Sequence, residues 1–512
     1  MMSEDLAVSE TKKWLIESAS PALVGVVGAG IMGAGIAQVA AQAGHQVLLA
    51  DMREGAAASA VVQIGKALDI LVSKGRMAAP DRDALLARIV PVGATVELKD
   101  AALVIEVIVE KLEPKQQLLR ELDALLAEGA IIATNTSSIS VTALANGMSN
   151  PQRLVGMHFF NPVPVMKLVE VVSGAETDAG VAQLIFDLGR RWGKTPVHAR
   201  STPGFIVNRI ARPYYAEALA LLQEQAGEPL QIDRALRGAG FRMGPCELMD
   251  LIGHDTNYLV TQSVFDANYG DKRFQPSQVQ KALVDGGRLG RKVGKGFYTG
   301  LPAASAKVEA TAAVLAPLSV AGCSPMALRL AGFLQHKGLP FIHAESAEWE
   351  GLGIGNMQVH LSRGRSAAQL ASMLNHPELA VMDWPLAPEH ADGLALAFAP
   401  KASAQARKQV DDVWHALGWE PLLLRDVPGL AVARTVAMLI NEGCDAVWQG
   451  VCDADAADLG VKLGLNYPAG PFEWLELVGA EPVVALLDGM FAAYRSERYR
   501  VSPLLQQRRW AA

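Results

Sequence analysis

Short apolar runs and longer amphipathic stretches alternate along the first part of the chain. The stretch LVGVVGAGIMGAGIAQVAAQAGHQVLLAD, which begins at Leu23, is typical of a strand, a tight turn, a helix and a second strand. Further along lie an amphipathic stretch at 54–76, a buried-strand run at 102–109, a helical stretch near 114–127 and the run AIIATNTSS at 130–138. This alternation predicts βα units and a doubly wound α/β domain with a parallel sheet.

Helical periodicity dominates after STPGFIVNR at 201–209, which predicts a helix from Phe205 to Gln225. The last third of the chain repeats this region. PGLAVAR at 428–434 resembles PGFIVNR at 203–209, and YPAGPFEWLELVG at 467–479 resembles FRMGPCELMDLIG at 241–253. Because the spacings agree, we predict a second helical unit. Ala433 stands where the first copy has Asn208, so we expect the second copy to be structural.

The two copies are separated by residues 301–427, which begin with an Ala- and Pro-rich linker and continue with short apolar runs. These runs suggest short strands and helices but contain no GxGxxG motif, so we predict a degenerate α/β segment. GLGIGNM at 351–357 has no clear strand before it and no helix after it, so we do not interpret it as a nucleotide site. The expected division is an N-terminal lead at 1–20, an α/β domain at 21–202, a helical domain at 203–300, the linker and degenerate segment at 301–427, and the helical repeat at 428–512.

Composition narrows the class of protein. With 512 residues, several domains are expected, and half of the residues are hydrophobic, which excludes disorder for most of the chain. The net charge of −7, without any basic segment, argues against nucleic acid as a partner. Four scattered cysteines predict no disulfide framework. An acidic N-terminus without an apolar core and the absence of a long apolar run predict a cytoplasmic protein with no membrane partner.

The glycine-rich turn after the first strand has the form GxGxxG, with Gly28, Gly30 and Gly33. Such glycines allow the tight turn, the approach of a pyrophosphate and close helix packing. Asp51 ends the second strand, where a carboxylate accepts hydrogen bonds from a ribose and favours NAD over NADP. NADP stays an alternative, because Arg53 lies nearby and an arginine there can accommodate its extra phosphate. Glycine turns also occur in proteins that bind no nucleotide.

Candidate chemistry follows in two further apolar runs, which carry His158 and Glu170 on either side of a PVP turn. A neutral imidazole can accept the hydroxyl proton during alcohol oxidation, and a carboxylate can orient it. The alternative is a core histidine bonded to a backbone carbonyl, with Glu170 at a strand edge. Asn208 offers a donor and an acceptor to a substrate, or it caps a helix.

Seven motifs in order make the chain similar to the L-3-hydroxyacyl-CoA dehydrogenase family over residues 22–300. They are GAGIMGAGIA, ExxxExxxxK at Glu106, Glu110 and Lys115, NTSS, HFFNPVPVMKLVEV, TPGFIVNR, MGPCELMDLIG and GRKVGKGFY. The resemblance implies an NAD-binding Rossmann domain followed by a helical domain that dimerises. The length resembles the long, duplicated members, which act on 3-hydroxyadipyl-CoA in phenylacetate breakdown or on 3-hydroxybutyryl-CoA.

The resemblance also implies roles for individual residues. His158 would be the general base and Glu170 its partner, while Ser137 and Asn208 would hold the substrate's oxygens. The positions that match family residues near NAD are Gly28, Gly30, Gly33, Asp51, Glu110, Lys115, Asn161 and Lys292. Lys74 would contact a CoA phosphate, or it is simply a solvated lysine. No metal is expected, because hydride chemistry belongs to the nicotinamide.

We therefore expect NAD-dependent oxidation of a (3S)-3-hydroxyacyl-CoA to a 3-oxoacyl-CoA, as in β-oxidation of fatty acids, with a preference for 3-hydroxyadipyl-CoA. The alternatives are 3-hydroxybutyryl-CoA, a free β-hydroxyacid, or an inactive NAD-binding protein. A distal carboxylate would need a cation, and Arg209, Arg212 and Arg242 are candidates by their position near the helical motifs. We expect the two helical copies to form a pseudo-dimeric core within the chain. Homo-oligomerisation of whole chains stays open.

Overall fold

The computed structural model describes residues 22–302 and 315–511. The predicted N-terminal lead at 1–20 and most of the predicted linker lie outside the described residues. Two compact units are formed by the chain. The first ends at Val207 and also includes Gly450–Leu465, whereas the second contains Asn208–Gln449 and the remaining C-terminal residues from Asn466.

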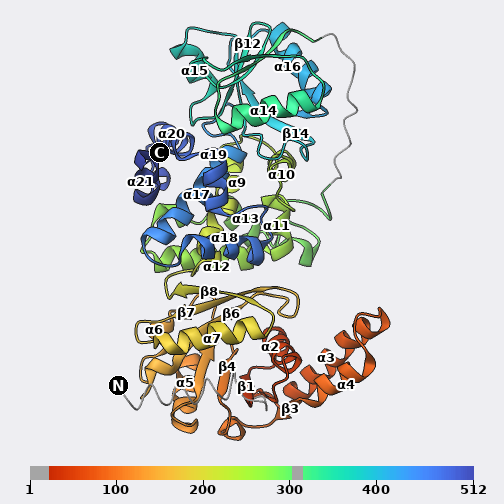
Figure 1. Cartoon of the computed structure of the whole chain (residues 1–512), viewed down its shortest axis with the longest axis vertical. Helices are drawn as coiled ribbons and strands as arrows, with labels where there is room; N and C mark the ends of the chain where they lie inside the picture. Colours follow the sequence, from red (N-terminus) through yellow and green to blue (C-terminus); the bar gives the residue numbers. More distant parts are fainter. Residues whose placement is uncertain (1–21, 303–314, 512) are drawn as a thin grey trace. The chain divides into compact units, whose positions relative to one another are not determined.

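The first unit contains a sheet of eight strands in the order β3-β2-β1-β4-β5-β6-β7-β8 (Figure 1). The pair β6–β7 is antiparallel and the other neighbouring pairs are parallel, so β7 and β8 both run opposite to the other six strands. Its strands are β1 (Val24–Val27), β2 (Val47–Ala50), β3 (Ile89–Val92), β4 (Leu103–Glu106), β5 (Ile131–Thr134), β6 (Leu154–Phe159), β7 (Leu168–Ser173) and β8 (Thr195–Arg200). Its helices are α2 (Ile31–Gln42), α3 (Ala56–Ser73), α4 (Ala79–Ala87), α5 (Leu112–Leu125), α6 (Val141–Leu144) and α7 (Ala179–Arg191), with short turns η2 (Thr95–Leu98) and η3 (Pro151–Arg153). The predicted α/β domain is confirmed, although α4 and β3 were not predicted.

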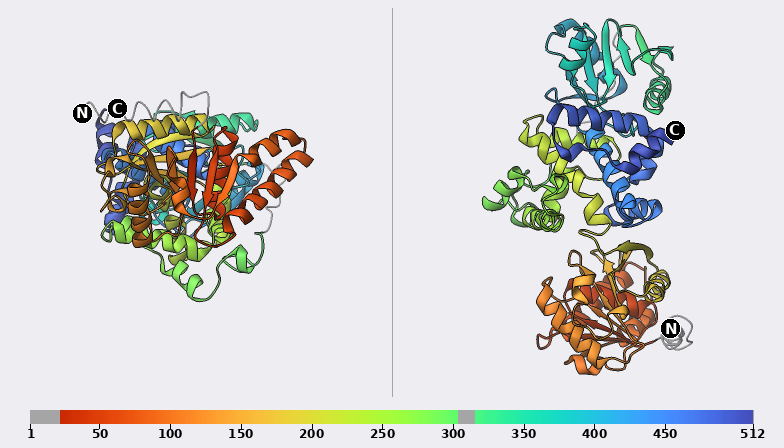
Figure 2. Two further views of the ribbon diagram at one scale, coloured as in Figure 1. Left: turned by 90° about the horizontal axis from the view of Figure 1, so that it is seen from below. Right: turned by 90° about the vertical axis from the view of Figure 1, so that its left-hand side faces the viewer.

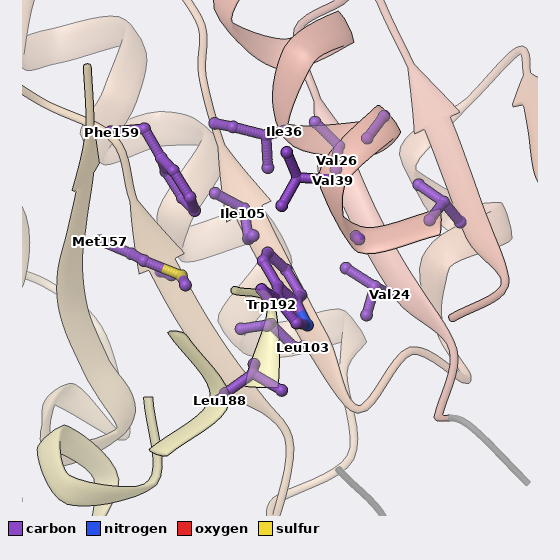
Figure 3. Packing of buried hydrophobic residues seen from close by; sticks show 14 of the residues in the cluster. Val24, Val26, Ile36, Val39, Leu103, Ile105, Met157, Phe159, Leu188 and Trp192 are labelled. Atoms are coloured by element: carbon purple, nitrogen blue, oxygen red, sulfur yellow. The ribbon is translucent and has the colours of Figure 1, made fainter. Parts of the chain in front are cut away.

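One apolar cluster joins this sheet to helices α2, α3, α4 and α7. Alternate strand residues contribute their side chains, and α2 contributes small residues such as Ala37 and Ala40 that let it lie close to the sheet. Figure 3 shows part of the cluster, with Val24, Val26, Ile36, Val39, Leu103, Ile105, Met157, Phe159, Leu188 and Trp192. Burial of this apolar surface fixes the strands, and with them the loops at their carboxyl ends.

Helix α3 is the one helix of the described chain that is long and apolar enough by itself to cross a membrane. The pair α19 (Pro471–Val478) and α20 (Ala480–Tyr494) would qualify together, but it is bent by 100°. Length and composition are weak evidence, because core helices of globular proteins meet the same criteria.

Both copies of the repeat contribute helices to the second unit. The first copy supplies α9 (Arg212–Gln223), α10 (Pro229–Gly238), α11 (Pro245–Ile252), α12 (His254–Ala267), η4 (Lys272–Phe274), α13 (Gln278–Asp285) and η5 (Arg291–Val293), preceded by α8 (Val207–Ile210). The second supplies α17 (Val432–Trp448), α19, α20, η6 (Glu497–Tyr499) and α21 (Pro503–Ala511). Helix α17 packs directly on α9 (Figures 1 and 2). The expected association of the two copies within one chain is therefore observed.

Reciprocal ion pairs relate the two copies. Arg209 of the first copy pairs with Glu442 at 2.6 Å, and the equivalent Arg434 of the second pairs with Glu217 at 2.9 Å. Such exchange of equivalent contacts is the signature of a two-fold interface. A strained turn is repeated as well, since Phe205 and Leu430 both have φ of 48°, a left-handed conformation that bulky residues rarely adopt.

The segment between the copies forms a second, mixed sheet in the order β10-β9-β11-β12-β13-β14-β15. Its strands are β9 (Leu318–Ala321), β10 (Ile342–Ala344), β11 (Gly351–Ile354), β12 (Met357–Leu361), β13 (Leu379–Met382), β14 (Gly393–Phe398) and β15 (Glu420–Leu423), and its helices are α14 (Pro325–His336), α15 (Ala367–Met373) and α16 (Ala404–Leu417). GLGIGNM forms the antiparallel hairpin β11–β12, which is not the strand-to-helix turn of a nucleotide site.

Helix α18 (Ala454–Leu465) belongs by sequence to the second copy, but it packs on β7 and β8 of the first unit. Gly460 and Gly464 allow this approach. An added Cβ at Gly460 would lie 3.0 Å from Ile206, and one at Gly464 would lie 3.0 Å from Leu168. The duplicated segment therefore also supports the sheet that carries His158 and Glu170.

Candidate active site

His158 and Glu170 face each other across the antiparallel pair β6–β7, in direct register. The Nδ1 atom of His158 lies 2.5 Å from Oε2 of Glu170. His158 is 6% exposed and Glu170 is fully buried. Among the described residues Nε2 of His158 has no hydrogen-bond partner, so this nitrogen is available. The PVP turn brings the two strands together as the sequence indicates, and the alternative of a histidine bonded to a backbone carbonyl is wrong.

The second oxygen of Glu170 is also fixed. Oε1 accepts hydrogen bonds of 3.0 Å from the amides of Ile206 and Val207, which directly precede Asn208 in the chain. The rings of Phe160 and Phe205 pack against the imidazole of His158, with centroids at 4.6 and 5.9 Å. Because both carboxylate oxygens are engaged and aromatic rings restrict the imidazole, the dyad is held in one orientation.

A buried charge cluster lies at the end of β4. Glu106 is fully buried and accepts hydrogen bonds of 2.7 Å from Nζ of Lys115, from the amide of Ile108 and from the hydroxyl of Thr134. Lys115 is itself 1% exposed. The acidic residue inside an apolar strand is thus fully paired, as burial of a charge requires. Lys115 pairs with Glu106 and with Glu110, at 2.7 and 3.2 Å, and its contact with NAD stays a prediction from the family resemblance.

Glu110 organises the loop after β5. Its carboxylate accepts hydrogen bonds from the hydroxyl of Thr136 at 2.7 Å and from the amide of Ser137 at 2.8 Å, and it lies 3.2 Å from Lys115. Burial alone would raise the pKa of Glu110, but Lys115 and these hydrogen bonds outweigh it and hold the pKa below its usual value. Glu110 therefore stays ionised and fixes Ser137, whose hydroxyl lies 3.3 Å away.

The glycine turn has the properties of a dinucleotide site. Gly28 has φ of 114°, and a Cβ at Gly33 would lie 1.7 Å from the carbonyl oxygen of Gly28. A Cβ at Gly30 would meet no protein atom within 4 Å, and Gly30 is the N-cap of α2. The first and third glycines are therefore needed by the fold. The second is exposed where a phosphate approaches a helix N-terminus.

Asp51 lies at the end of β2, beside this turn. It accepts a hydrogen bond of 2.8 Å from the amide of Ala29 and pairs with Arg53 at 3.0 Å. The hydrogen bond from Arg53 lowers the pKa of Asp51 to about 2. A hollow beside it is lined by Asp51, Met52, Gly55, Pro91 and Val92, among others. An ionised carboxylate at this place accepts hydrogen bonds from ribose hydroxyls.

Exposed apolar side chains surround the same edge of the sheet. Ile31, Met52 and Val109 follow β1, β2 and β4 respectively, and they are 80%, 99% and 62% exposed. Exposed large apolar side chains at three neighbouring strand ends are typical of a site that binds a ligand with flat rings. The residues present therefore fit a dinucleotide.

The remaining candidates lie as follows. Asn161 is exposed and follows β6, and Lys74 is exposed at the end of α3. Lys292 pairs with Asp255 at 2.6 Å in the second unit. Asn208 is half-buried, and its carbonyl oxygen accepts a hydrogen bond from Arg212. No cluster of metal-ligating side chains occurs in residues 22–302 and 315–511.

No role was predicted from the sequence for two positioning residues. Asn135 accepts a hydrogen bond of 2.8 Å from the amide of Phe159, next to His158, and Thr136 links Glu110 to the β5 loop. Their signal was weak, because polar residues after a strand are common in any α/β protein.

The second sheet has no equivalent dyad. Its strands β13, β14 and β15 repeat the pairing of β6, β7 and β8, and the register places Asp383 at the position of His158 and Ala395 at that of Glu170. Both oxygens of Asp383 accept hydrogen bonds from the amides of residues 431–433, so this carboxylate replaces Glu170 in holding the turn. The second copy therefore lacks the histidine of the dyad, and the structural role expected from Ala433 stays a prediction.

Three family models match the chain. The 3-hydroxyacyl-CoA dehydrogenase NAD binding domain matches residues 23–202, and the C-terminal domain of the same family matches twice, at 204–300 and 429–510. The 3-hydroxybutyryl-CoA dehydrogenase reduced Rossmann-fold domain matches residues 359–428.

Individual relatives agree with these matches. The chain is 42% identical to the 3-hydroxyadipyl-CoA dehydrogenase of Escherichia coli, over 95% of this chain and 97% of that protein. A crystal structure of 3-hydroxybutyryl-CoA dehydrogenase from Escherichia coli superposes with a TM-score of 0.87 and 41% identity, covering 96% of this chain and 98% of that one. The chain is also 38% identical to the mitochondrial hydroxyacyl-coenzyme A dehydrogenase of Sus scrofa. This match spans 58% of the chain and 96% of that protein. The chain belongs to the NAD-dependent 3-hydroxyacyl-CoA dehydrogenase family.

Proposed function

We propose that the protein oxidises a (3S)-3-hydroxyacyl-CoA to the 3-oxoacyl-CoA with NAD, and that His158 is the general base. The observation that carries this proposal is the contact between Nδ1 of His158 and the buried carboxylate of Glu170. A carboxylate at Nδ1 favours the tautomer with the proton on that nitrogen, which leaves the lone pair of Nε2 as acceptor. The same carboxylate stabilises the imidazolium after proton transfer.

The dinucleotide-binding residues support the cofactor side of the proposal. When bound, NAD supplies the hydride acceptor for the substrate carbon. Gly28, Gly30 and Gly33 form the phosphate turn, and Asp51 accepts hydrogen bonds from the adenosine ribose. We assign Glu110 the task of ordering the loop that carries Ser137, whereas Asn161, Lys292 and Lys74 keep the roles that the family resemblance gives them.

The substrate's oxygens are assigned to Ser137 and Asn208. The hydroxyl of Ser137 is oriented by Glu110, and the side chain of Asn208 offers both a donor and an acceptor. The names of the two Escherichia coli relatives differ in the acyl group, adipyl in one and butyryl in the other. We favour the adipyl group for this chain.

The test is NADH formation with 3-hydroxyadipyl-CoA and 3-hydroxybutyryl-CoA, assayed side by side. We expect turnover of both thioesters and a higher kcat/KM for the adipyl substrate. Binding of NAD without turnover of either thioester would refute the proposal and leave a free β-hydroxyacid dehydrogenase or an inactive binding protein.

Gly30→Ala is expected to weaken NAD binding by about 10-fold or more while leaving the fold stable. The added methyl group meets no protein atom but occupies the position from which a phosphate approaches the backbone. NAD affinity by fluorescence titration and the melting temperature of the free protein check this expectation.

Gly33→Ala is the matched control, because its methyl group would collide with the carbonyl oxygen of Gly28. We expect this variant to lower the melting temperature before any ligand is added. Equal NAD affinity of Gly30→Ala and the wild type would contradict the assignment of the phosphate turn.

A further inference from the structure

Arg212 carries a buried positive charge without a counterion among the described residues. It is 4% exposed, and its Nε donates to the carbonyl oxygen of Asn208 at 2.8 Å while Nη1 donates to the hydroxyl of Thr261 at 3.0 Å. The guanidinium also lies over the ring of Tyr215, 4.9 Å from its centroid. No carboxylate approaches it within the described part of the chain, and burial lowers its pKa. Buried charges are normally paired, so Arg212 is suited to bind an anionic group from outside the protein.

The other two arginine candidates are accounted for differently. Arg209 is paired with the buried Glu442 at 2.6 Å, which neutralises its charge within the helical core. Arg242 is exposed. Of the three, only Arg212 is both buried and without a carboxylate partner among the described residues.

Some charged residues recur in both helical copies, and these residues form the ion pairs that hold the copies together. Arg209, Glu217 and Arg273 recur at the same spacing as Arg434, Glu442 and Arg498, and all six take part in ion pairs. Their recurrence shows that charges needed for packing were kept in both copies.

Arg212 does not recur in this way. At the same spacing the second copy has Ala437 in place of Arg212 and Ala433 in place of Asn208. The helices α12 and α20 begin after equivalent glycines, and this alignment sets Leu487 against Thr261. The copy without a catalytic dyad has therefore lost Asn208, Arg212 and Thr261 together. This joint loss associates the buried cation with the substrate rather than with packing.

We propose that Arg212 binds a carboxylate at the distal end of the acyl chain and makes the enzyme selective for dicarboxylic 3-hydroxyacyl-CoA substrates. This inference rests on the proposed function, in which Asn208 holds a substrate oxygen. Residues four apart are neighbours on one helical face, separated by about one turn of 5.4 Å. In an adipyl group, three carbon–carbon bonds separate the reacting C3 from the distal carboxyl carbon. A hydroxyl-bearing carbon at Asn208 therefore leaves the far carboxylate within reach of Arg212.

The contacts of Arg212 hold its guanidinium in one orientation and leave some of its N–H groups free to bind a carboxylate. Asn208 and Thr261 each occupy one N–H group, and Tyr215 supports the plane of the guanidinium. Among the described residues Nη2 has no acceptor, which leaves N–H groups to donate to an incoming carboxylate. A planar guanidinium is suited to this, because its parallel N–H groups match the two oxygens of a carboxylate.

The test compares two substrates of equal length, 3-hydroxyadipyl-CoA and 3-hydroxyhexanoyl-CoA, of which only the first has a distal carboxylate. We expect the wild type to prefer the adipyl substrate in kcat/KM. Arg212→Met should lower kcat/KM for the adipyl substrate by about 10- to 100-fold, mainly through KM, and should leave the hexanoyl substrate within about 3-fold. Arg212→Lys should retain part of the preference, since it keeps the charge but not the planar geometry.

Arg242→Met is the matched control and should leave both substrates unchanged. An equal loss for both substrates in Arg212→Met, at unchanged melting temperature, would overturn the inference by showing a purely structural role. If Arg212→Met does not fold, Thr261→Val serves instead and should reduce the adipyl preference. A wild type that oxidises the hexanoyl substrate without preferring the adipyl one also overturns the inference but leaves the proposed function intact. Failure with both thioesters refutes the proposed function itself.

Discussion

His158→Ala is expected to lower kcat by about 10²- to 10⁴-fold, the usual contribution of a general base. The variant removes the proton acceptor but touches neither the glycine turn nor Asp51, so NAD affinity should stay within about 2-fold of the wild type. Steady-state NADH formation with an acyl-CoA substrate gives the rate, and fluorescence titration gives the affinity.

Two further variants separate catalysis from folding. His198→Gln changes an exposed histidine of β8 in the same unit and should leave kcat unchanged. Glu170→Gln keeps an oxygen for the amides of Ile206 and Val207 but removes the charge that stabilises the imidazolium, so we expect a loss smaller than that of His158→Ala. Wild-type turnover by His158→Ala would exclude this residue as the base.

Strands and helices with a regular pattern of apolar and polar residues were predictable from the sequence. Strands β1, β4 and β5 are short apolar runs next to turns, and α2 and α5 follow them at the expected positions. The meeting of His158 and Glu170 was also predictable, because the PVP turn between two apolar runs favours an antiparallel pair. The repeat was visible as two motifs with matching spacing.

The remaining features depend on contacts between segments that are distant in sequence. The sequence shows Glu106 and Lys115 as charges, but only the topology of β4 and α5 makes them a buried pair. Arg209 and Arg212 look alike in sequence, yet one meets Glu442 of the other copy and the other meets no carboxylate in the described chain. The mixed strand directions of the second sheet were equally hidden, since β11, β13 and β14 are buried on both faces and have continuous apolar runs whichever way they run.

Glu217→Leu is expected to destabilise the protein by about 3–5 kcal/mol, because it leaves buried cations without their anion. Glu217 is fully buried between Arg434 at 2.9 Å and Arg498 at 2.7 Å. Burial alone would raise its pKa, but the two arginines outweigh this and keep the pKa below its usual value. The free energy of unfolding from urea denaturation measures the loss. Because the paired helices belong to one chain, the midpoint should not depend on protein concentration.

The equivalent variant Glu442→Leu provides an internal comparison. It removes the carboxylate that pairs with Arg209 and Arg273. Because these ion pairs are equivalent to those of Glu217, we expect a similar loss in the free energy of unfolding.

A triple variant that replaces Glu217, Arg434 and Arg498 by leucine should recover most of the stability, since removal of a whole buried ion cluster is often neutral. Asp285→Asn, in an exposed pair with Lys281, should have little effect. A change below about 0.5 kcal/mol in Glu217→Leu would show that the paired copies do not depend on these charges.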